Sequence, residues 1–145
     1  MVCYYDSSIF LSVVLDQQPN DVLLSYWDDV TARLSSTLLK IECLVGIRRA
    51  GALQGFAVEA PWAKERIDAL RSYVDHVSCK HVDDEIEETV RNTGALANCR
   101  ALDAIHIATA LSFEPHSDEP IVIVTLDARM RAVAESLRFQ VAPPV

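Results

Sequence analysis

Short apolar runs alternate along the chain with longer segments in which apolar residues recur every three or four positions. The runs at 2–5, 32–35, 77–82, 121–125 and 139–142 predict short strands, the third of them at a sheet edge. Helical spacing predicts helices over 9–14, 22–27, 37–53, 61–74 and 101–111, and further helices after the acids at 83–85 and 127. Strands that alternate with helices in this way predict parallel βαβ units.

Residues with strong preferences for helix ends mark several of these boundaries. Ser7 and Ser8 are expected to cap the first helix, and Pro61 suits the first turn of the fourth. Gly51 and Gly55 are expected to bracket a break at the end of the long helix. No repeat or long linker divides the sequence. We therefore expect a single domain over 1–145, an α/β fold in which a three-layer α/β/α sandwich surrounds a central, mainly parallel sheet.

The composition is that of a globular protein outside the membrane. Half of the 145 residues are hydrophobic and 23% are charged, and no apolar run approaches the ~20 residues that a membrane span needs. The opening MVCYYDSS has no basic segment typical of a signal peptide. The four cysteines are scattered, which favours buried thiols in a reducing cytoplasm over disulfides or a zinc site. We expect a cytoplasmic location.

The formal net charge of -8 restricts how this protein could hold nucleic acid. Proteins that bind nucleic acid by neutralising phosphates usually present a basic face. Any such role here would have to use a local basic strip, bound cations or a partner. The excess of acidic residues would equally favour binding of a basic peptide.

Four acidic residues occupy positions that a parallel sheet would bring together. Asp6 and Asp127 directly follow predicted buried strands, Glu42 comes about two turns into the helix after the second strand, and Asp103 opens the helix over 101–111. The carboxyl ends of parallel strands and the starts of the crossover helices share one rim of the sheet. Carboxylates crowded in this way are costly unless a cation neutralises them, and hard oxygen ligands suit Mg²⁺ or Mn²⁺. Such a site could hydrolyse a phosphodiester.

The segments that carry these acids read YYDSSIF, LKIECLVGIRR, RALDAIHIATAL and IVTLDARM. In order and spacing they resemble the motifs of a PIN domain, and more narrowly those of VapC-type toxins from bacterial toxin–antitoxin pairs. The resemblance covers nearly the whole chain. It implies a Mg²⁺-dependent endoribonuclease whose metal ligands are Asp6 and Asp103, with Glu42 and Asp127 completing the site directly or through water.

The same resemblance implies roles for neighbouring residues and for partners. Ser8 and Thr125 match small hydroxyl positions that support the acids. The family also implies RNA as substrate, a homodimer, and a cognate antitoxin whose tail covers the cleft.

Several basic residues lie near the acid-bearing segments. Arg100, one turn before Asp103, is a candidate RNA contact. Four more arginines are candidates for phosphate contacts, although solvated surface is the more common role for such residues: Arg48, Arg49, Arg129 and Arg131. His106 is expected to be a packed or hydrogen-bonded helix residue outside the catalytic set.

A non-catalytic alternative stays open, in which a PIN-fold module uses its acidic rim to bind a cation or a basic peptide. Two other phosphate-handling classes fit less well. A receiver domain would need an acid pair and a lysine after a late strand, and neither is evident around Thr125. A haloacid dehalogenase phosphatase would need a second aspartate where Ser8 stands. The acidic cluster over 83–88 is expected to be a solvated helix start rather than a site.

Overall fold

Five parallel strands form one sheet in the computed structural model, which describes residues 1–16, 23 and 25–144. The strands lie in the order β3-β2-β1-β4-β5, so β3 is at an edge as the sequence predicted. Their bounds are β1 (Val2–Tyr5), β2 (Ala32–Ser36), β3 (Ser78–Lys80), β4 (Ile121–Val124) and β5 (Gln140–Ala142). Of the helix predicted over 22–27, residues 22 and 24 lie outside the described residues, and 25–29 form a turn.

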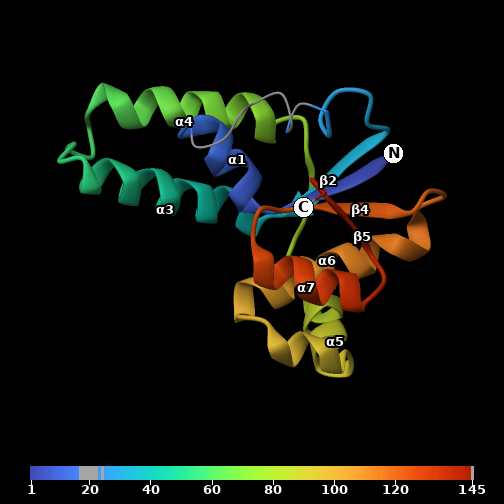
Figure 1. The fold of residues 1–145 in the computed structure, drawn as a ribbon. Coiled ribbons are helices and arrows are strands. Elements are labelled where there is room, and N and C mark those ends of the chain that lie inside the picture. The colour runs from blue at the N-terminus through green and yellow to red at the C-terminus, as the bar shows by residue number, and fades with distance from the viewer. Residues whose placement is uncertain (17–22, 24, 145) are drawn as a thin grey trace.

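Helices cover both faces of the sheet (Figure 1). One layer holds α1 (Ser7–Val14), α3 (Leu38–Leu53) and α4 (Pro61–Val74). The opposite layer holds α5 (Asp84–Asn92), α6 (Ala101–Phe113) and α7 (Ala128–Ser136). The predicted three-layer α/β/α sandwich with a central parallel sheet is therefore confirmed.

Alternation along the buried central strands divides the core into two halves. In β1, Cys3 and Tyr5 join the core under α1, α3 and α4, whereas Val2 and Tyr4 join the core against α6 and α7. All four side chains of β1 and of β4 are buried. Strands covered on both faces need apolar residues at every position, which explains the unbroken apolar runs in the sequence.

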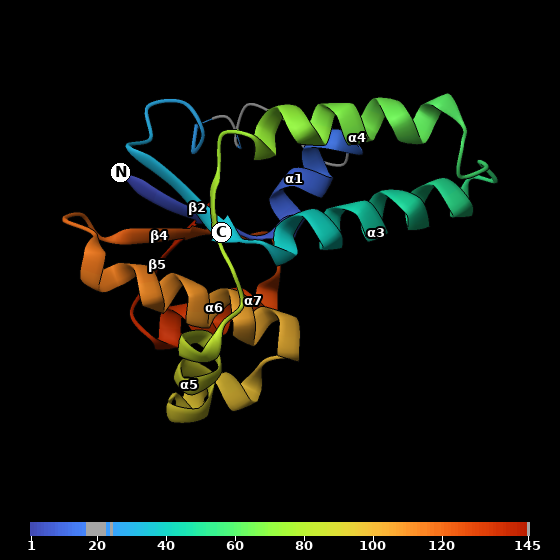
Figure 2. The same ribbon diagram turned by 180° about the vertical axis from the view of Figure 1, so that it is seen from behind.

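The long helix α3 and the returning α4 form a hairpin that extends beyond the sheet (Figure 2). The break expected between Gly51 and Gly55 is confirmed, because α3 ends at Leu53. The ring of Trp62 packs against Gly51, where an added Cβ would lie 3.1 Å from a ring carbon. The chain then turns around Gly55, whose φ of +79° favours glycine.

The cap of α1 also differs from the sequence expectation. Asp6, rather than Ser7 or Ser8, caps this helix: its carboxylate accepts a hydrogen bond from the Ser8 amide at 3.1 Å. Asp6 has extended backbone geometry, with φ −95° and ψ 175°. Aspartate and serine are equally good N-caps, so residue preference alone could not choose between them.

Two features of the described residues concern membrane spans and cysteines. None of their helices combines the length and the apolar character that a membrane crossing requires. All four cysteine thiols are free, and those of Cys3 and Cys43 are buried.

The crossing of α1 and α3 is close enough to give a stability prediction. A Cβ added at Gly46 would lie 2.7 Å from both Cδ atoms of Leu11 on α1. We therefore expect Gly46→Val to lower the free energy of unfolding by about 1–3 kcal/mol through overpacking, measured by urea denaturation. Gly94→Ala is the matched control, because nothing lies within 4 Å of its added Cβ, and it should be neutral or slightly stabilising. Wild-type stability in the Gly46 variant would refute the close crossing.

Candidate active site

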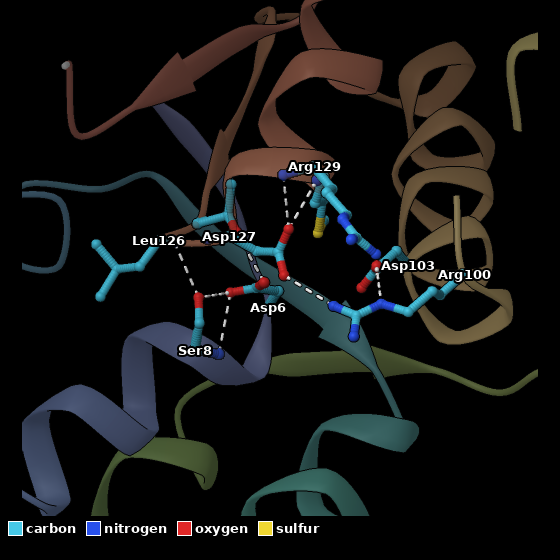
Figure 3. A network of polar contacts seen from close by, with 9 residues as sticks. Asp6, Ser8, Arg100, Asp103, Leu126, Asp127 and Arg129 are labelled. Carbon is cyan, nitrogen blue, oxygen red and sulfur yellow. Dashed lines mark hydrogen bonds and ion pairs between the residues drawn. The ribbon is translucent and has the colours of Figure 1, made fainter. Parts of the chain in front are cut away.

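All four predicted acids line one cavity of about 340 Å³ at the rim where the strands end. Asp6 follows β1 and Asp127 comes shortly after β4, while Glu42 projects from α3 and Asp103 from the first turn of α6. Figure 3 shows three of these acids side by side with the polar groups that hold them. The remaining lining residues are Ser7, Ser8, Arg100, Ala101, Leu102 and His106.

Asp6 is the most tightly held of the four carboxylates. Its Oδ1 accepts hydrogen bonds from the amide and the hydroxyl of Ser8, at 3.1 and 2.5 Å. Its Oδ2 accepts from the Thr125 hydroxyl at 2.7 Å. Burial raises the pKa of the Asp6 carboxyl, and the two hydroxyl groups partly oppose that rise. The structure thus places Ser8 and Thr125 directly against Asp6.

The two hydroxyl groups also tie Asp6 to the loop after β4. Ser8 Oγ accepts from the amide of Leu126 at 2.9 Å, and Thr125 Oγ1 accepts from the amide of Asp127 at 3.0 Å (Figure 3). Asp127 caps α7, since its Oδ1 accepts from the amides of Arg129 and Met130 at 2.8 and 2.9 Å. Asp6 and Asp127 each cap a helix while facing the cavity, so their orientation is set by backbone amides.

Arg100 reaches two of the acids from just before α6. Its guanidinium donates to Asp127 Oδ2 at 3.3 Å and lies 3.5 Å from Asp103 Oδ2. Asp103 Oδ2 is buried and has no hydrogen-bond partner. Burial and the neighbouring Asp127 raise the pKa of the Asp103 carboxyl, and Arg100 partly opposes this. The arginine side chain is 65% exposed, so this ion pair is weak and easily displaced.

Glu42 is held by a pair of residues that the sequence did not mark as part of the site. His106 Nε2 lies 2.5 Å from Glu42 Oε1, and His106 Nδ1 lies 2.8 Å from the hydroxyl oxygen of Tyr4. His106 is buried and hydrogen-bonded, as expected, but it also borders the acid cavity. Two signals in the sequence could have found this pair: Tyr4 comes two residues before Asp6, and His106 comes one helical turn after Asp103.

The remaining arginines divide into structural and free groups. Arg48 donates to the carbonyl of Val58, and Arg131 donates to the carbonyl of Pro143, so both serve the fold. Arg49 lines an apolar groove that continues from the acid cavity past Glu42. Arg129 is exposed beside Asp127, which leaves Arg49, Arg100 and Arg129 as the arginines at the cavity rim.

The acidic cluster over 83–88 has the structural role that was expected of it. Asp83 caps α5 by accepting from the Ile86 amide at 3.2 Å, and Lys80 pairs with both Asp83 and Glu85. The Ile86 amide and the Lys80 ammonium hold the pKa of Asp83 below its usual range. An adjoining cavity of about 490 Å³ between α5 and α6 has a mainly apolar lining. We place no chemistry there.

The acid cavity suits a hard divalent cation. As the described side chains lie, no three His, Cys, Asp or Glu groups converge on one point to hold an ion, and Arg100 spans Asp103 and Asp127. The donor set nevertheless consists of carboxylate oxygens, which Mg²⁺ and Mn²⁺ prefer. The buried Oδ2 of Asp103 makes no hydrogen bond and lies 3.5 Å from the Arg100 guanidinium, so it is an oxygen that a cation would satisfy.

Comparisons with known proteins identify the family of this chain. The family model of the PIN domain matches residues 3–136, and the chain belongs to the PIN domain family. Two relatives from Mycobacterium tuberculosis are each 26% identical over 143 residues, covering 97% of this chain and 94% of the relative: Ribonuclease VapC45 (strain CDC 1551 / Oshkosh) and Ribonuclease VapC49 (strain ATCC 25618 / H37Rv). A solved structure of VapBC-1 from nontypeable Haemophilus influenzae has a TM-score of 0.62 at 15% identity, covering 97% of this chain and 96% of that chain.

The crowded acids predict a trade-off between stability and charge. When folding raises the pKa of a carboxyl, that group does not change the free energy of unfolding at a pH below its ordinary pKa, about 4. It destabilises the folded protein as the pH rises from there through the raised pKa. In EDTA at neutral pH, Asp103→Asn should therefore melt a few degrees above wild type, and the difference should disappear near pH ~4.

Asp83→Asn is the matched control for this melting experiment. Because the pKa of Asp83 is lowered, its charge stabilises the fold, and removing that charge should lower the melting temperature. A variant at Asp103 that melts below wild type at neutral pH would contradict the account of the crowded acids.

Proposed function

We propose that this protein is an endoribonuclease that depends on Mg²⁺ or Mn²⁺ and acts as the toxin of a toxin–antitoxin pair. The observation that carries the proposal is the convergence of Asp6, Glu42, Asp103 and Asp127 on one cavity. Membership of the PIN domain family and the similarity to proteins named as VapC ribonucleases support it.

Asp6 and Asp103 are the proposed metal ligands, with Asp127 and Glu42 completing the site directly or through water. A cation bound by them would neutralise charge on a phosphodiester and make water a stronger nucleophile. Ser8 and Thr125 would keep both oxygens of Asp6 aimed at the cavity through the hydrogen bonds they donate. Arg100 occupies part of this space, and its weak pairing lets it leave when a divalent cation enters.

RNA binding by a chain of net charge -8 needs local positive charge. The arginines at the rim, Arg49, Arg100 and Arg129, are the proposed phosphate contacts. Arg100, once released from the acids, would be within reach of a phosphate at the cavity. The bound cation supplies the remaining positive charge, which removes the conflict between the acidic composition and an RNA substrate.

A cognate antitoxin and a homodimer are further parts of the proposal. Apolar side chains lie exposed beside the cavity on α3 and α6: Ile41 at 61%, Val45 at 44% and Leu102 at 47%. Such a cluster is typical of a surface that a protein partner covers. The VapBC-1 neighbour supports an antitoxin partner. The four free thiols support action in the cytoplasm.

The test combines metal binding with RNA cleavage. Purified protein, shown by mass spectrometry to be free of partner, is titrated with Mn²⁺ by calorimetry and then incubated with total bacterial RNA and Mg²⁺ or Mn²⁺. We expect binding and cleavage in wild type and a loss of cleavage of about 100-fold or more in Asp103→Asn and Asp6→Asn, because the metal's charge stabilisation is worth several kcal/mol.

Two controls test whether RNA cleavage depends on the metal and on the acids of the cavity. EDTA should stop cleavage by wild type, and Asp83→Asn, purified in the same way, should cleave like wild type because Asp83 caps α5 away from the cavity. Full cleavage by Asp103→Asn would refute the proposal. Metal binding by wild type without any RNA cleavage would favour the non-catalytic module.

A further inference from the structure

His106 connects the acid cavity to the interior of the fold. Its side chain is 1% exposed, and both ring nitrogens have partners: Nε2 faces Glu42 Oε1 and Nδ1 faces the hydroxyl of Tyr4. If position 106 served packing alone, an apolar residue would suffice there, because the surrounding core positions hold apolar side chains such as Ile107 and Ala110. The two polar contacts indicate that the imidazole has a bonding role.

Glu42 depends on this contact for its orientation. In the part of the chain that the structure describes, His106 is the hydrogen-bond partner of the Glu42 carboxylate. Asp6 and Asp127, by contrast, are each held by backbone amides. A glutamate has three rotatable side-chain bonds, and fixing them costs conformational entropy. Among the described residues, no other side chain of α3 hydrogen-bonds the Glu42 carboxylate, so without His106 repulsion from Asp6 would turn it away from the cavity.

The direction of the hydrogen bonds follows from their chemistry. An ionised carboxylate can only accept, so His106 Nε2 carries a proton and donates to Glu42. In the neutral ring Nδ1 then accepts from the Tyr4 hydroxyl. Tyr4 is fully buried, and its ring meets the imidazole edge-on at 5.8 Å. The Glu42 carboxylate therefore selects the tautomer, and Tyr4 holds the angle of the imidazole.

The three linked residues come from three elements that each carry an acid or directly precede one. Tyr4 lies on β1 two residues before Asp6, and His106 lies on α6 one turn after Asp103. Glu42 belongs to α3, on the opposite side of the sheet from α6 (Figure 1). The chain of hydrogen bonds joins these elements directly beneath the cavity, so it fixes where Glu42 stands relative to the other acids.

We propose that His106, anchored by Tyr4, is a positioning residue that holds the Glu42 carboxylate in the acid cavity for cation binding. The proposal rests on the proposed function of the same cavity. Partners that orient a metal ligand typically contribute 10–100-fold to metal affinity. We therefore expect His106→Leu to bind Mn²⁺ about 10–100-fold more weakly than wild type in calorimetry.

The conservative variant His106→Gln distinguishes positioning from packing. Its amide nitrogen can reach Glu42 much as Nε2 does, so it should recover most of the Mn²⁺ affinity that His106→Leu loses. Tyr4→Phe keeps the imidazole and removes its anchor, and a smaller loss is expected. Phe113→Leu is the control for packing, because Phe113 contacts the Tyr4 ring without joining the hydrogen bonds, and it should bind Mn²⁺ like wild type.

A double-mutant cycle shows whether His106 acts through Glu42. Glu42→Gln combined with His106→Leu should lose no more Mn²⁺ affinity than Glu42→Gln alone. The ¹⁵N chemical shifts of the His106 ring, measured without metal, should report the Nε2–H form in wild type and a changed ring signal in Tyr4→Phe. This NMR readout tests the proton placement independently of any metal binding.

The Mn²⁺-binding results distinguish a failure of the positioning role of His106 from a failure of the metal site itself. If wild type binds no Mn²⁺, the metal site itself fails. If wild type binds Mn²⁺ and His106→Leu binds it equally well, the positioning role is overturned while the metal site stands. Losses that multiply in the double variant, or an Nδ1–H ring in wild type, would also overturn it.

Discussion

Repulsion among carboxylates crowded at the rim of a parallel sheet is the constraint on which the site depends. Separate polar groups in the structure hold each carboxylate in place against this repulsion. Backbone amides at two helix starts hold Asp6 and Asp127. The Thr125 hydroxyl holds the second oxygen of Asp6, and the Ser8 hydroxyl holds the loop beside it. Arg100 and the imidazole of His106 face the other two acids. Much of the local hydrogen bonding therefore serves to keep negative charges in place.

The topology makes this crowding unavoidable. Because β1 lies at the centre of the sheet between β2 and β4, residues that follow these strands reach the same rim. The parallel register brings Tyr5 beside Val124, so the residues after them, Asp6 and Thr125, meet across two segments that are 119 positions apart. The acids that begin or line helices then complete the cavity from both layers.

Much of the fold could be predicted from residue patterns because it depends on local features. The apolar runs at β1 and β4 identify buried strands, and the acids that follow them must lie at the rim of any parallel sheet. The end of α3 between Gly51 and Gly55 could be predicted because a glycine such as Gly55 favours a turn with positive φ. The cap of α1 failed because aspartate and serine have similar preferences.

The polar contacts between distant residues could not be read from the chain in the same way. Glu42 and His106 are 64 positions apart, and Arg100 reaches Asp127 across 27 positions. Their pairing depends on how two helical layers meet at one rim, which no local pattern encodes. Asp6, Asp103 and Asp127 were visible in the sequence because each sits beside a strand or helix boundary, and Glu42 because apolar residues surround it within a helix.

The central claim is that these acids form a cation site that Arg100 fills when the cation is absent. An anomalous difference map from crystals of the protein soaked in Mn²⁺ tests it directly. The account predicts a peak bounded by Asp6, Asp103 and Asp127, with the Arg100 guanidinium turned away from the acids. A map without a peak in this cavity, with Arg100 still between Asp103 and Asp127 at saturating Mn²⁺, would contradict it.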